Sequence, residues 1–319
     1  MKQAGAGTPG AGTPGGGAPG AGSPGSVERT ASGADVRGMS PRAAAVRAGW
    51  RRGVIELRQS FTNGGELFSH FLWPVLMLAA LFFLRHRDFG STGFLLGALA
   101  LPSILGMNAA MGMVSMSQQL TADREDGTLL RAKAIPNGML GYLVGKVVSV
   151  AGGLLADLAI LLIPGLLIVD GLALGSAHWP TLGWVLLLGL IATLPIGAIL
   201  GSVFTTARAQ GLIQLPVLAL IAISGIFYPI TALPGWLEWI GQLTPIYWMG
   251  LGMRSALLPN SAVVVELGDS WRHVETVGVL GIWAVGGLLL APVVLRRMAR
   301  RESGSKIAER RERALQRVA

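Results

Sequence analysis

The chain has 319 residues, of which 51% are hydrophobic and only 13% are charged. A soluble domain usually carries about 25% charged residues, so this composition, with its repeated long apolar runs, excludes an ordinary soluble enzyme and indicates an integral membrane protein. Cysteine is absent, which excludes disulfides and thiolate chemistry, and the net charge of +9 comes mainly from arginines outside the apolar runs, where a lipid bilayer is a better partner than nucleic acid.

The first forty residues, 1–40, differ in composition from the rest of the chain. They repeat Gly, Ala, Pro and small hydroxyl residues, as in GAGTPGAGTPGGGAPGAGSPG, without an apolar period. Such a segment buries too little surface to offset the entropy lost on ordering, so we expect a disordered cytoplasmic tail. A secretory signal needs an apolar core near the start, and no apolar run begins before Leu67. We therefore expect no signal peptide.

An amphipathic helix is predicted ahead of the first apolar run. Its apolar residues recur at three- and four-residue steps, with arginines largely off that stripe. The stripe consists of Val46, Trp50, Val54, Leu57 and Phe61. An apolar stripe with a basic remainder is typical of a helix that lies in the membrane interface. The alternative is a solvated helix that packs on a partner.

Six apolar runs are candidates for membrane spans, each of which takes about 20 residues in a helix. They are Leu67–Leu84, Phe94–Met116, Leu143–Val169, Leu182–Phe204, Leu212–Pro229 and Val274–Leu295. Each run contains a proline, which membrane helices tolerate because neighbouring groups satisfy the freed carbonyls. The sequence therefore predicts an all-α integral membrane fold with six spans over residues 41–297.

Loop arginines predict the orientation, because cytoplasmic loops carry an excess of lysine and arginine. Positive residues gather before span one, between spans two and three (with Arg124), and in a basic tail over 298–319. The opposite side holds fewer, such as Arg254, although Arg85 and Arg87 conflict with the rule. Both termini are therefore predicted to be cytoplasmic. The Gly-, Ala- and Arg-rich composition indicates a GC-rich bacterial genome, hence a bacterial plasma membrane.

A charged segment, residues 122–138, joins spans two and three and contains DREDGTLLRAKAIPNG. Asp123 or Asp126 can cap the start of a helix, where the helix dipole favours an acidic group. Leucines and an isoleucine supply an apolar side, and Pro-Asn-Gly ends the segment. We expect a short surface helix, acidic at one end and basic at the other, suited to docking into a groove of a second protein. The alternative is a solvated turn.

Two polar residues lie inside predicted spans. Asp157 is near the middle of span three, where a charge costs roughly 2.5–3.5 kcal/mol on insertion scales, so it should face a polar interior or be protonated. It is either a substrate-pathway carboxylate, attractive for cationic drugs, or one partner of a hydrogen bond between helices. Asn108 lies near Met107, Met111 and Met113, which form either an adaptable pathway wall or ordinary packing.

The sequence shows no nucleotide-binding loop. The nearest stretch, GYLVGKVV over Gly141–Val148, has too few residues between its glycines, and Val147 stands where a Ser or Thr must reach magnesium. Lys146 is therefore interpreted as an interfacial anchor at the start of span three. The sequence has no HExxH motif or paired carboxylates, so we expect no catalytic residue, metal site or cofactor in this chain.

Two stretches carry a resemblance to ABC-2 type transporter permeases. REDGTLLRAKAIPNGMLGYLVGK, Arg124–Lys146, resembles the family signature of an acidic pair, Gly-Thr-Leu, a basic residue, a proline and Gly-Lys. SGIFYPITALPGWLEWIGQLTPIYWMGLGMR, Ser224–Arg254, is similar to a second signature of Ser-Gly, an aromatic residue, Leu-Pro, and a proline before an arginine. The resemblance covers roughly Val46 to Arg297. Within the family, the chain is similar to permeases of exporters of the daunorubicin- and multidrug-resistance type.

The resemblance implies a permease subunit of an ATP-driven exporter. Separate ABC ATPase subunits would bind ATP and magnesium, and a second permease copy, as a homodimer, would complete the channel. In this family the segment between spans two and three contacts the ATPase. The residues carried over to that interface are Glu125, Asp126, Gly127, Thr128 and Arg131. Those assigned to a substrate pathway are Asn108, Met111, Asp157 and Phe227.

The family also places short re-entrant helices between spans five and six. Leu233–Leu243 fits such a helix, because it is too short to span and is bracketed by Pro234 and Pro245. Tryptophan favours the water interface, so the tryptophans of this region would ring the outer leaflet as anchors or contact a ligand. They are Trp236, Trp239, Trp248 and Trp271.

Composition and resemblance together predict export of a drug, an antibiotic or another hydrophobic small molecule. Export of a lipid-linked glycan or polysaccharide is the alternative within the class. A different class, a multi-span membrane enzyme or a secondary transporter, would show a polar catalytic cluster at one membrane face or repeated halves, and neither is visible in the sequence.

Overall fold

The computed structural model describes residues 40–88, 95–172, 175, 177–204, 207–226 and 228–301. All described residues belong to one unit of the chain, which begins at Ser40. Within them the secondary structure is helical apart from turns, loops and one isolated β-bridge, so the all-α prediction is confirmed for this part. The predicted tails, 1–40 and 298–319, lie largely outside the described residues.

The first helix, α1 (Pro41–Ser60), begins at a clear cap. The Ser40 hydroxyl accepts a hydrogen bond from the backbone N–H of Ala43, and a proline in the first turn needs no N–H partner. Trp50 and Val54 of the predicted apolar stripe are exposed. The face of α1 that packs on the protein therefore combines the small residues Gly49 and Gly53 with the last part of the stripe, since Leu57 contacts α6 and Phe61 contacts His70.

Five helical segments in the described part of the chain are long and apolar enough to cross a membrane. They are α2 (Gly64–Leu84), the pair α3 (Leu96–Ala110) and α4 (Gly112–Glu125), α6 (Gly138–Ile168), α7 (Trp179–Val203) and α11 (His273–Arg301). These correspond to predicted spans one, two, three, four and six. The second differs from the prediction, because helix continues past Met116 as far as Glu125, where neighbouring helices provide partners for its charged residues.

The fifth predicted span, Leu212–Pro229, is only partly helical. Its helix, α8 (Ala207–Ala222), has 16 residues, which at about 1.5 Å per residue falls short of a hydrocarbon core about 30 Å thick. The chain then turns at Gly225, whose φ of 68° lies in the left-handed region that glycine adopts without strain. Helix length therefore supports five spans in the described residues and does not confirm six.

Short helices connect α8 to α11. α9 (Gly235–Leu243) lies where the sequence predicts a helix too short to span, and α10 (Pro245–Leu257), which follows it, is buried along its whole length. Three 3₁₀ segments complete the connection: η3 (Ile230–Ala232), η4 (Asn260–Val265) and η5 (Leu267–Asp269). Trp236 and Trp239 are exposed, whereas Trp248 is 2% exposed. The prediction that Trp248 belongs to a surface ring is therefore wrong, because α10 folds into the bundle.

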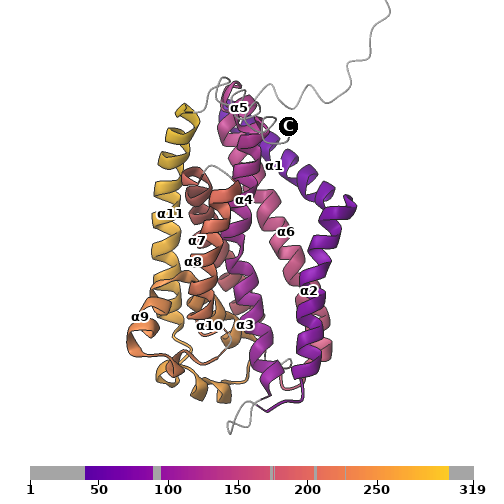
Figure 1. Ribbon diagram of the computed structural model, residues 1–319, viewed down its shortest axis with the longest axis vertical. Helices are drawn as coiled ribbons and strands as arrows, with labels where there is room; N and C mark the ends of the chain where they lie inside the picture. The colour runs from indigo at the N-terminus through magenta and orange to yellow at the C-terminus, as the bar shows by residue number, and fades with distance from the viewer. Residues whose placement is uncertain are drawn as a thin grey trace, which may run out of the picture. The chain divides into compact units, whose positions relative to one another are not determined.

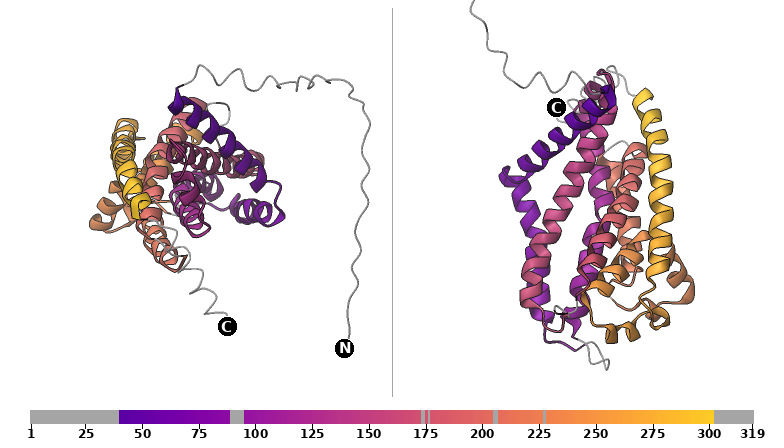
Figure 2. Two further views of the ribbon diagram at one scale, coloured as in Figure 1. Left: turned by 90° about the horizontal axis from the view of Figure 1, so that it is seen from above. Right: turned by 180° about the vertical axis from the view of Figure 1, so that it is seen from behind.

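The core of this unit forms where α10 packs on α3 and α7, with α4 and α11 also against α7, while α1 packs on α6 (Figures 1 and 2). The short helix α5 (Thr128–Lys133) lies at one end of the bundle, near α1 and the C-terminal part of α11 (Figure 1). The opposite end carries α9 and the loop that leads into α11. We call these the α5 end and the α9 end.

Candidate functional site

The charged segment 122–138 folds as a helix end, a tight turn and a second short helix. Its first residues complete α4 at Glu125, Asp126 and Gly127 form the turn, and α5 follows. Gly127 has a left-handed φ of 80°, and Asn137, which precedes α6, has a φ of 54°, a conformation that asparagine tolerates better than most residues. The segment is therefore a structured helix between two left-handed residues and not a solvated turn.

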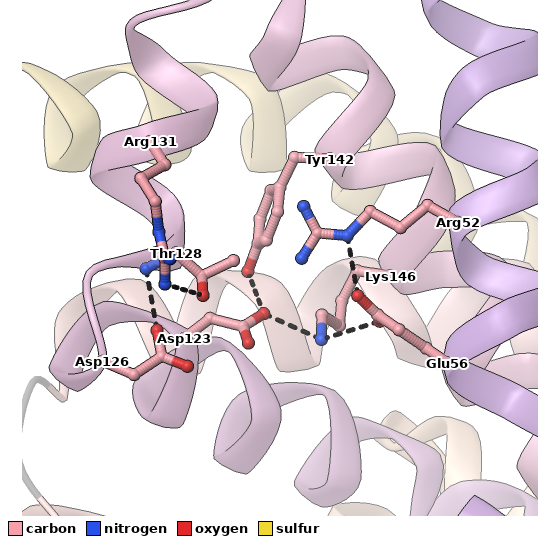
Figure 3. Close-up of polar contacts among 8 residues, drawn as sticks. All are labelled: Arg52, Glu56, Asp123, Asp126, Thr128, Arg131, Tyr142 and Lys146. Atoms are coloured by element: carbon pink, nitrogen blue, oxygen red, sulfur yellow. Dashed lines mark hydrogen bonds and ion pairs between the residues drawn. The ribbon is translucent and has the colours of Figure 1, made fainter. Parts of the chain in front are cut away.

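Asp126 contacts the start of this short helix from the position before its N-cap residue, Gly127, and the helix has no side-chain cap. The Asp126 Oδ1 accepts a hydrogen bond from the backbone N–H of Thr128 at 2.7 Å, and Arg131 donates from Nη2 to the Thr128 hydroxyl at 3.3 Å (Figure 3). Neither of the two aspartates that the sequence offers for capping is the N-cap residue of α5: Asp126 lies one position before it, and Asp123 lies within α4 and has another role.

α5 turns its apolar side inward and presents charge outward. Leu129 is buried, whereas Glu125, Asp126 and Arg131 are exposed, and Ile135 just beyond the helix is also exposed. The two other residues assigned to the interface, at the turn and the helix start, are half-buried. The five residues therefore form one continuous surface, acidic where the helix begins and basic where it ends.

Asp123 points inward to a buried lysine. The Lys146 side chain is 6% exposed, and its Nζ lies 2.8 Å from Asp123 Oδ2 and 3.3 Å from Glu56 Oε2 (Figure 3). The Tyr142 hydroxyl donates to the same Asp123 oxygen at 2.7 Å. A buried ammonium is strongly destabilising unless it is paired, and here it has two carboxylates. The interpretation of Lys146 as an interfacial anchor is therefore wrong.

Arg52 extends this network along α1. Its Nε donates to Glu56 Oε1 at 2.8 Å, and its guanidinium lies 5.9 Å from the centroid of the Tyr142 ring. Burial, the largest single influence, lowers the pKa of Arg52, but the hydrogen bond and charge of Glu56 together with the charges of Asp123 and Tyr142 raise that pKa above its usual value. Two cations and two carboxylates thus balance, and we call Arg52, Glu56, Asp123, Tyr142 and Lys146 the Lys146 network.

Four glycines bring α1 and α6 into backbone contact beside the Lys146 network. A Cβ atom on Gly49 would lie 2.2 Å from the carbonyl oxygen of Gly141, and one on Gly53 would lie 2.4 Å from that of Gly145. Small residues four positions apart on both helices permit this close approach. The stretch that resembles a phosphate loop in the sequence is therefore a helix-packing surface.

A polar cavity of about 760 Å³ lies beside the Lys146 network, between α1, α2, α4 and α6. Its ionisable lining residues are Glu56, Glu66, Asp123, Asp126, Asp157, Lys146 and His70. Glutamine and serine side chains supply further hydrogen-bonding groups. Glu56 and Asp123 are balanced by Lys146 and Arg52, so the remaining carboxylates outnumber the one histidine and give the cavity a negative potential, which favours cations.

Asp157 lies in the wall of this cavity and pairs with a histidine from another helix. Its Oδ1 is 2.5 Å from Nδ1 of His70 on α2, and both side chains are partly exposed, at 22% and 18%. Phe61 stacks on the His70 ring with 4.4 Å between centroids. Asp157 thus makes a hydrogen bond between helices and also faces the cavity, so the two interpretations of this residue are compatible.

The other residues assigned to a substrate pathway do not join Asp157. Asn108 is buried in α3 and Met111 is half-buried at the break between α3 and α4, and neither lines the polar cavity. Met107 and Met113 belong to the apolar core, which favours ordinary packing for this stripe. Phe227 lies outside the described residues. Of the three pathway candidates that the structure describes, only Asp157 reaches the cavity.

Two arginines that the sequence places in loops are buried in the bundle. The Arg124 Nη2 donates to the carbonyl oxygen of Ser202 on α7 at 3.2 Å. Arg254 forms a two-bond ion pair with Glu266, at 2.5 and 3.2 Å, and donates to the Ser103 hydroxyl at 3.1 Å. Both loop assignments are wrong, because α4 is longer than its apolar run and α10 is a buried helix.

Comparison with known proteins assigns most of the described helices to one protein family. A family model described as ABC-2 family transporter protein matches residues 65–293, well over half of the chain. The match begins in α2 and extends into α11, so it includes the charged segment, α6 and the helix that carries His70. A search among curated proteins returns no match. Within the described residues, no group of three or more His, Cys, Asp or Glu side chains is arranged to hold a metal ion.

Proposed function

This chain belongs to the ABC-2 family of transporters, and from that premise we propose that it is the permease of an ATP-driven exporter of hydrophobic cations. It is a multi-pass membrane protein and the membrane permease of an ABC transporter. Members of this family work with an ABC ATPase subunit. The proposal adds the docking site, the direction of transport and the class of substrate.

The ATPase docks on the exposed surface formed by α5 and the turn before it. The single observation that carries this assignment is a charged, outward-facing helix attached to one end of the helical bundle. Glu125 and Asp126 provide its acidic part, Arg131 its basic part, and buried Leu129 fixes the helix from behind. Such a surface matches a partner through complementary charge, whereas the lipid-facing helices offer mainly apolar side chains.

Transport requires that movement of this docking surface changes the arrangement of the membrane-spanning helices. ATP and magnesium bind to the partner subunits, and closure of those subunits moves α5, which favours an outward-open arrangement of the spans. The α5 end and both termini face the bacterial cytoplasm in this proposal. A second copy of the chain completes the channel as a homodimer, with α8 and the chain after it as the short fifth span and α9 and α10 as re-entrant helices.

The substrate class follows from the polar cavity. Its volume of about 760 Å³ falls within the range of about 300–1,000 Å³ that is usual for small-molecule sites. Its carboxylates attract a cation, and the apolar helices around it suit a hydrophobic body. A lipid-linked glycan with an anionic phosphate link would be repelled by the same carboxylates. These features favour a cationic drug or antibiotic over the glycan alternative.

The proposal is tested by reversing one charge at the docking surface. The chain is purified with its ATPase subunit, reconstituted in vesicles, and assayed for ATP hydrolysis and ATP-driven transport of ethidium. We expect Glu125→Arg to lower ATPase co-purification and ethidium transport by about tenfold, because a like charge now faces the partner. Asp170→Arg, at another exposed acidic residue, which lies at the α9 end, should leave both unchanged. Equal effects of the two variants would contradict docking at α5.

A further inference from the structure

Lys146 connects three helices at the α5 end of the bundle. It belongs to α6, and it pairs with Glu56 from α1 and with Asp123 from α4 (Figure 3). Because its ammonium is almost excluded from solvent, the separation of either carboxylate would leave a buried charge with incomplete pairing. The ion pairs therefore favour arrangements in which α1, α4 and α6 stay together at this end.

The same network lies directly behind the docking surface. Asp123 is about one helical turn before the Asp126–Gly127 turn that leads into α5. On the other side, the start of α6 touches α5, since a Cβ on Gly138 would lie 2.2 Å from the carbonyl oxygen of Ala132. A displacement of α5 thus reaches the end of α4 and the start of α6, and Lys146 joins both.

α1 is held on the far side of the network by two kinds of contact. The glycine pairs Gly49–Gly141 and Gly53–Gly145 place the two backbones in contact, while the Lys146–Glu56 ion pair fixes the position of α1 along α6. The exposed Trp50 and the neighbouring arginines of α1 form the surface that suits a membrane interface. Any motion passed to α1 would therefore act on the membrane surface around the polar cavity.

We infer that Lys146 is a positioning residue for ATP-driven transport, which makes α1, the last turn of α4 and the first turns of α6 move with α5 as one rigid unit. The inference rests on the proposed function, because the displacement comes from an ATPase docked on α5. Without the charge at Lys146 the ATPase still docks and hydrolyses ATP, but its motion no longer reaches α1. Transport then becomes uncoupled from hydrolysis.

The first experiment compares Lys146→Met with Lys146→Arg in the reconstituted permease–ATPase complex, with ethidium as the probe. For Lys146→Met we expect the amount of ethidium transported per ATP to fall about tenfold, a size typical of coupling between sites, while ATP hydrolysis continues. Lys146→Arg keeps a charge between the two carboxylates and should restore most of the coupling. Arg87→Met, at an exposed residue just beyond α2 at the α9 end, is the matched control and should behave as the unchanged chain.

A triple variant separates coupling from folding. Glu56→Gln, Asp123→Asn and Lys146→Met together leave no buried charge unpaired, so the complex should fold and assemble. It lacks the ionic link, and we expect it to stay as uncoupled as Lys146→Met. Recovery of ethidium transport per ATP in the triple variant would show that Lys146 only balances buried charge, which would overturn the inference.

A disulfide tests the rigid unit without reference to substrate. The chain has no cysteine, and a Cβ on Gly152 of α6 would lie 3.4 Å from Cγ of Leu57 on α1, a geometry compatible with a disulfide between cysteines at these positions. In Leu57→Cys/Gly152→Cys we expect equal cross-linking rates with and without ATP, and an ATP-dependent rate once Lys146→Met is added.

The outcomes of these experiments distinguish the proposed transport function from the inference about Lys146. Oxidation of the cysteine pair should leave ethidium transport unchanged; a loss that reduction reverses would show that α1 leaves α6 during the cycle and would overturn the inference. An ATP-independent cross-linking rate in the Lys146→Met background would overturn it as well. A complex that does not transport ethidium but shows the expected cross-linking pattern would contradict the proposed substrate class and leave the rigid unit supported.

Discussion

Asp157 is the ionisable residue whose surroundings bear most directly on the choice of substrate. It lies within a membrane-spanning helix, where an ionisable group is generally functional or paired. Here it is paired with His70 and also faces the polar cavity. A carboxylate in that position can hold the helices together while it attracts a cation from the cavity, and the two roles predict different responses to neutralisation.

We expect Asp157→Asn to raise the ethidium concentration for half-maximal transport about tenfold, equivalent to about 1.4 kcal/mol. The amide has the shape of the carboxylate and still hydrogen-bonds to His70, but it carries no charge. Concentration dependence of transport in the reconstituted complex measures the effect, with Nile red as an uncharged probe and Asp170→Asn as a control outside the cavity. Equal losses for both probes would show that Asp157 is only a contact between helices.

Individual residues also show which contacts can be predicted from the sequence and which cannot. Arg124 and Glu125 are adjacent, yet the first is 1% exposed and the second is exposed, because successive residues point to different sides of a helix. The sequence shows both charges but not their partners, since Ser202 is 78 residues from Arg124 and Glu56 is 90 residues from Lys146. The contact of Asp126 with the start of α5 was within reach of the sequence, because its partner is two residues away.

At the scale of elements, the packing of α1 on α6 depends on glycine. We expect Gly49→Ala to displace α1 and to lower the free energy of unfolding by about 1–3 kcal/mol, as overpacking usually does, because its methyl group would meet the Gly141 carbonyl oxygen. Thermal unfolding followed by fluorescence-detected gel filtration measures the change. Gly278→Ala in α11, where nothing lies within 4 Å of the new methyl, should have no such effect. A similar shift in both variants would contradict backbone contact between α1 and α6.

The sequence predicts those helices that hydropathy and residue spacing can identify. Long apolar runs predict α2, α6, α7 and α11, because lipid and protein interior both favour apolar side chains. The same signal does not reveal that α8 ends early or that α10 is fully buried, since hydropathy does not distinguish lipid from protein neighbours. Glycines four positions apart in the sequence are a usable signal for the packing of α1 on α6. They are Gly49 and Gly53 in α1, and Gly141 and Gly145 in α6. The last two also belong to the stretch that resembles a phosphate loop, although their role is in helix packing.

At the scale of the whole described unit, the proposed function divides the work between the two ends. The α5 end carries the proposed docking surface, the Lys146 network and the large acidic cavity. Toward the α9 end lies a smaller, largely apolar cavity of about 280 Å³, with the Arg254–Glu266 pair in its wall. A larger polar cavity toward one end and a smaller apolar cavity toward the other fit a permease that receives its substrate at the α5 end and releases it at the other.

This division requires the α5 end to face the cytoplasm, where an ATPase and ATP are available. The cysteine-free chain allows a direct test in intact cells with a membrane-impermeant maleimide. Ile135 beside α5 and Val264 in η4 are both 62% exposed, so single cysteines there should react equally once cells are permeabilised. In intact cells we expect Val264→Cys to be labelled and Ile135→Cys to be protected, because the arginine-rich loops lie inside. Labelling of Ile135→Cys from outside would place α5 beyond the reach of any ATPase, and export driven through this surface would then be impossible.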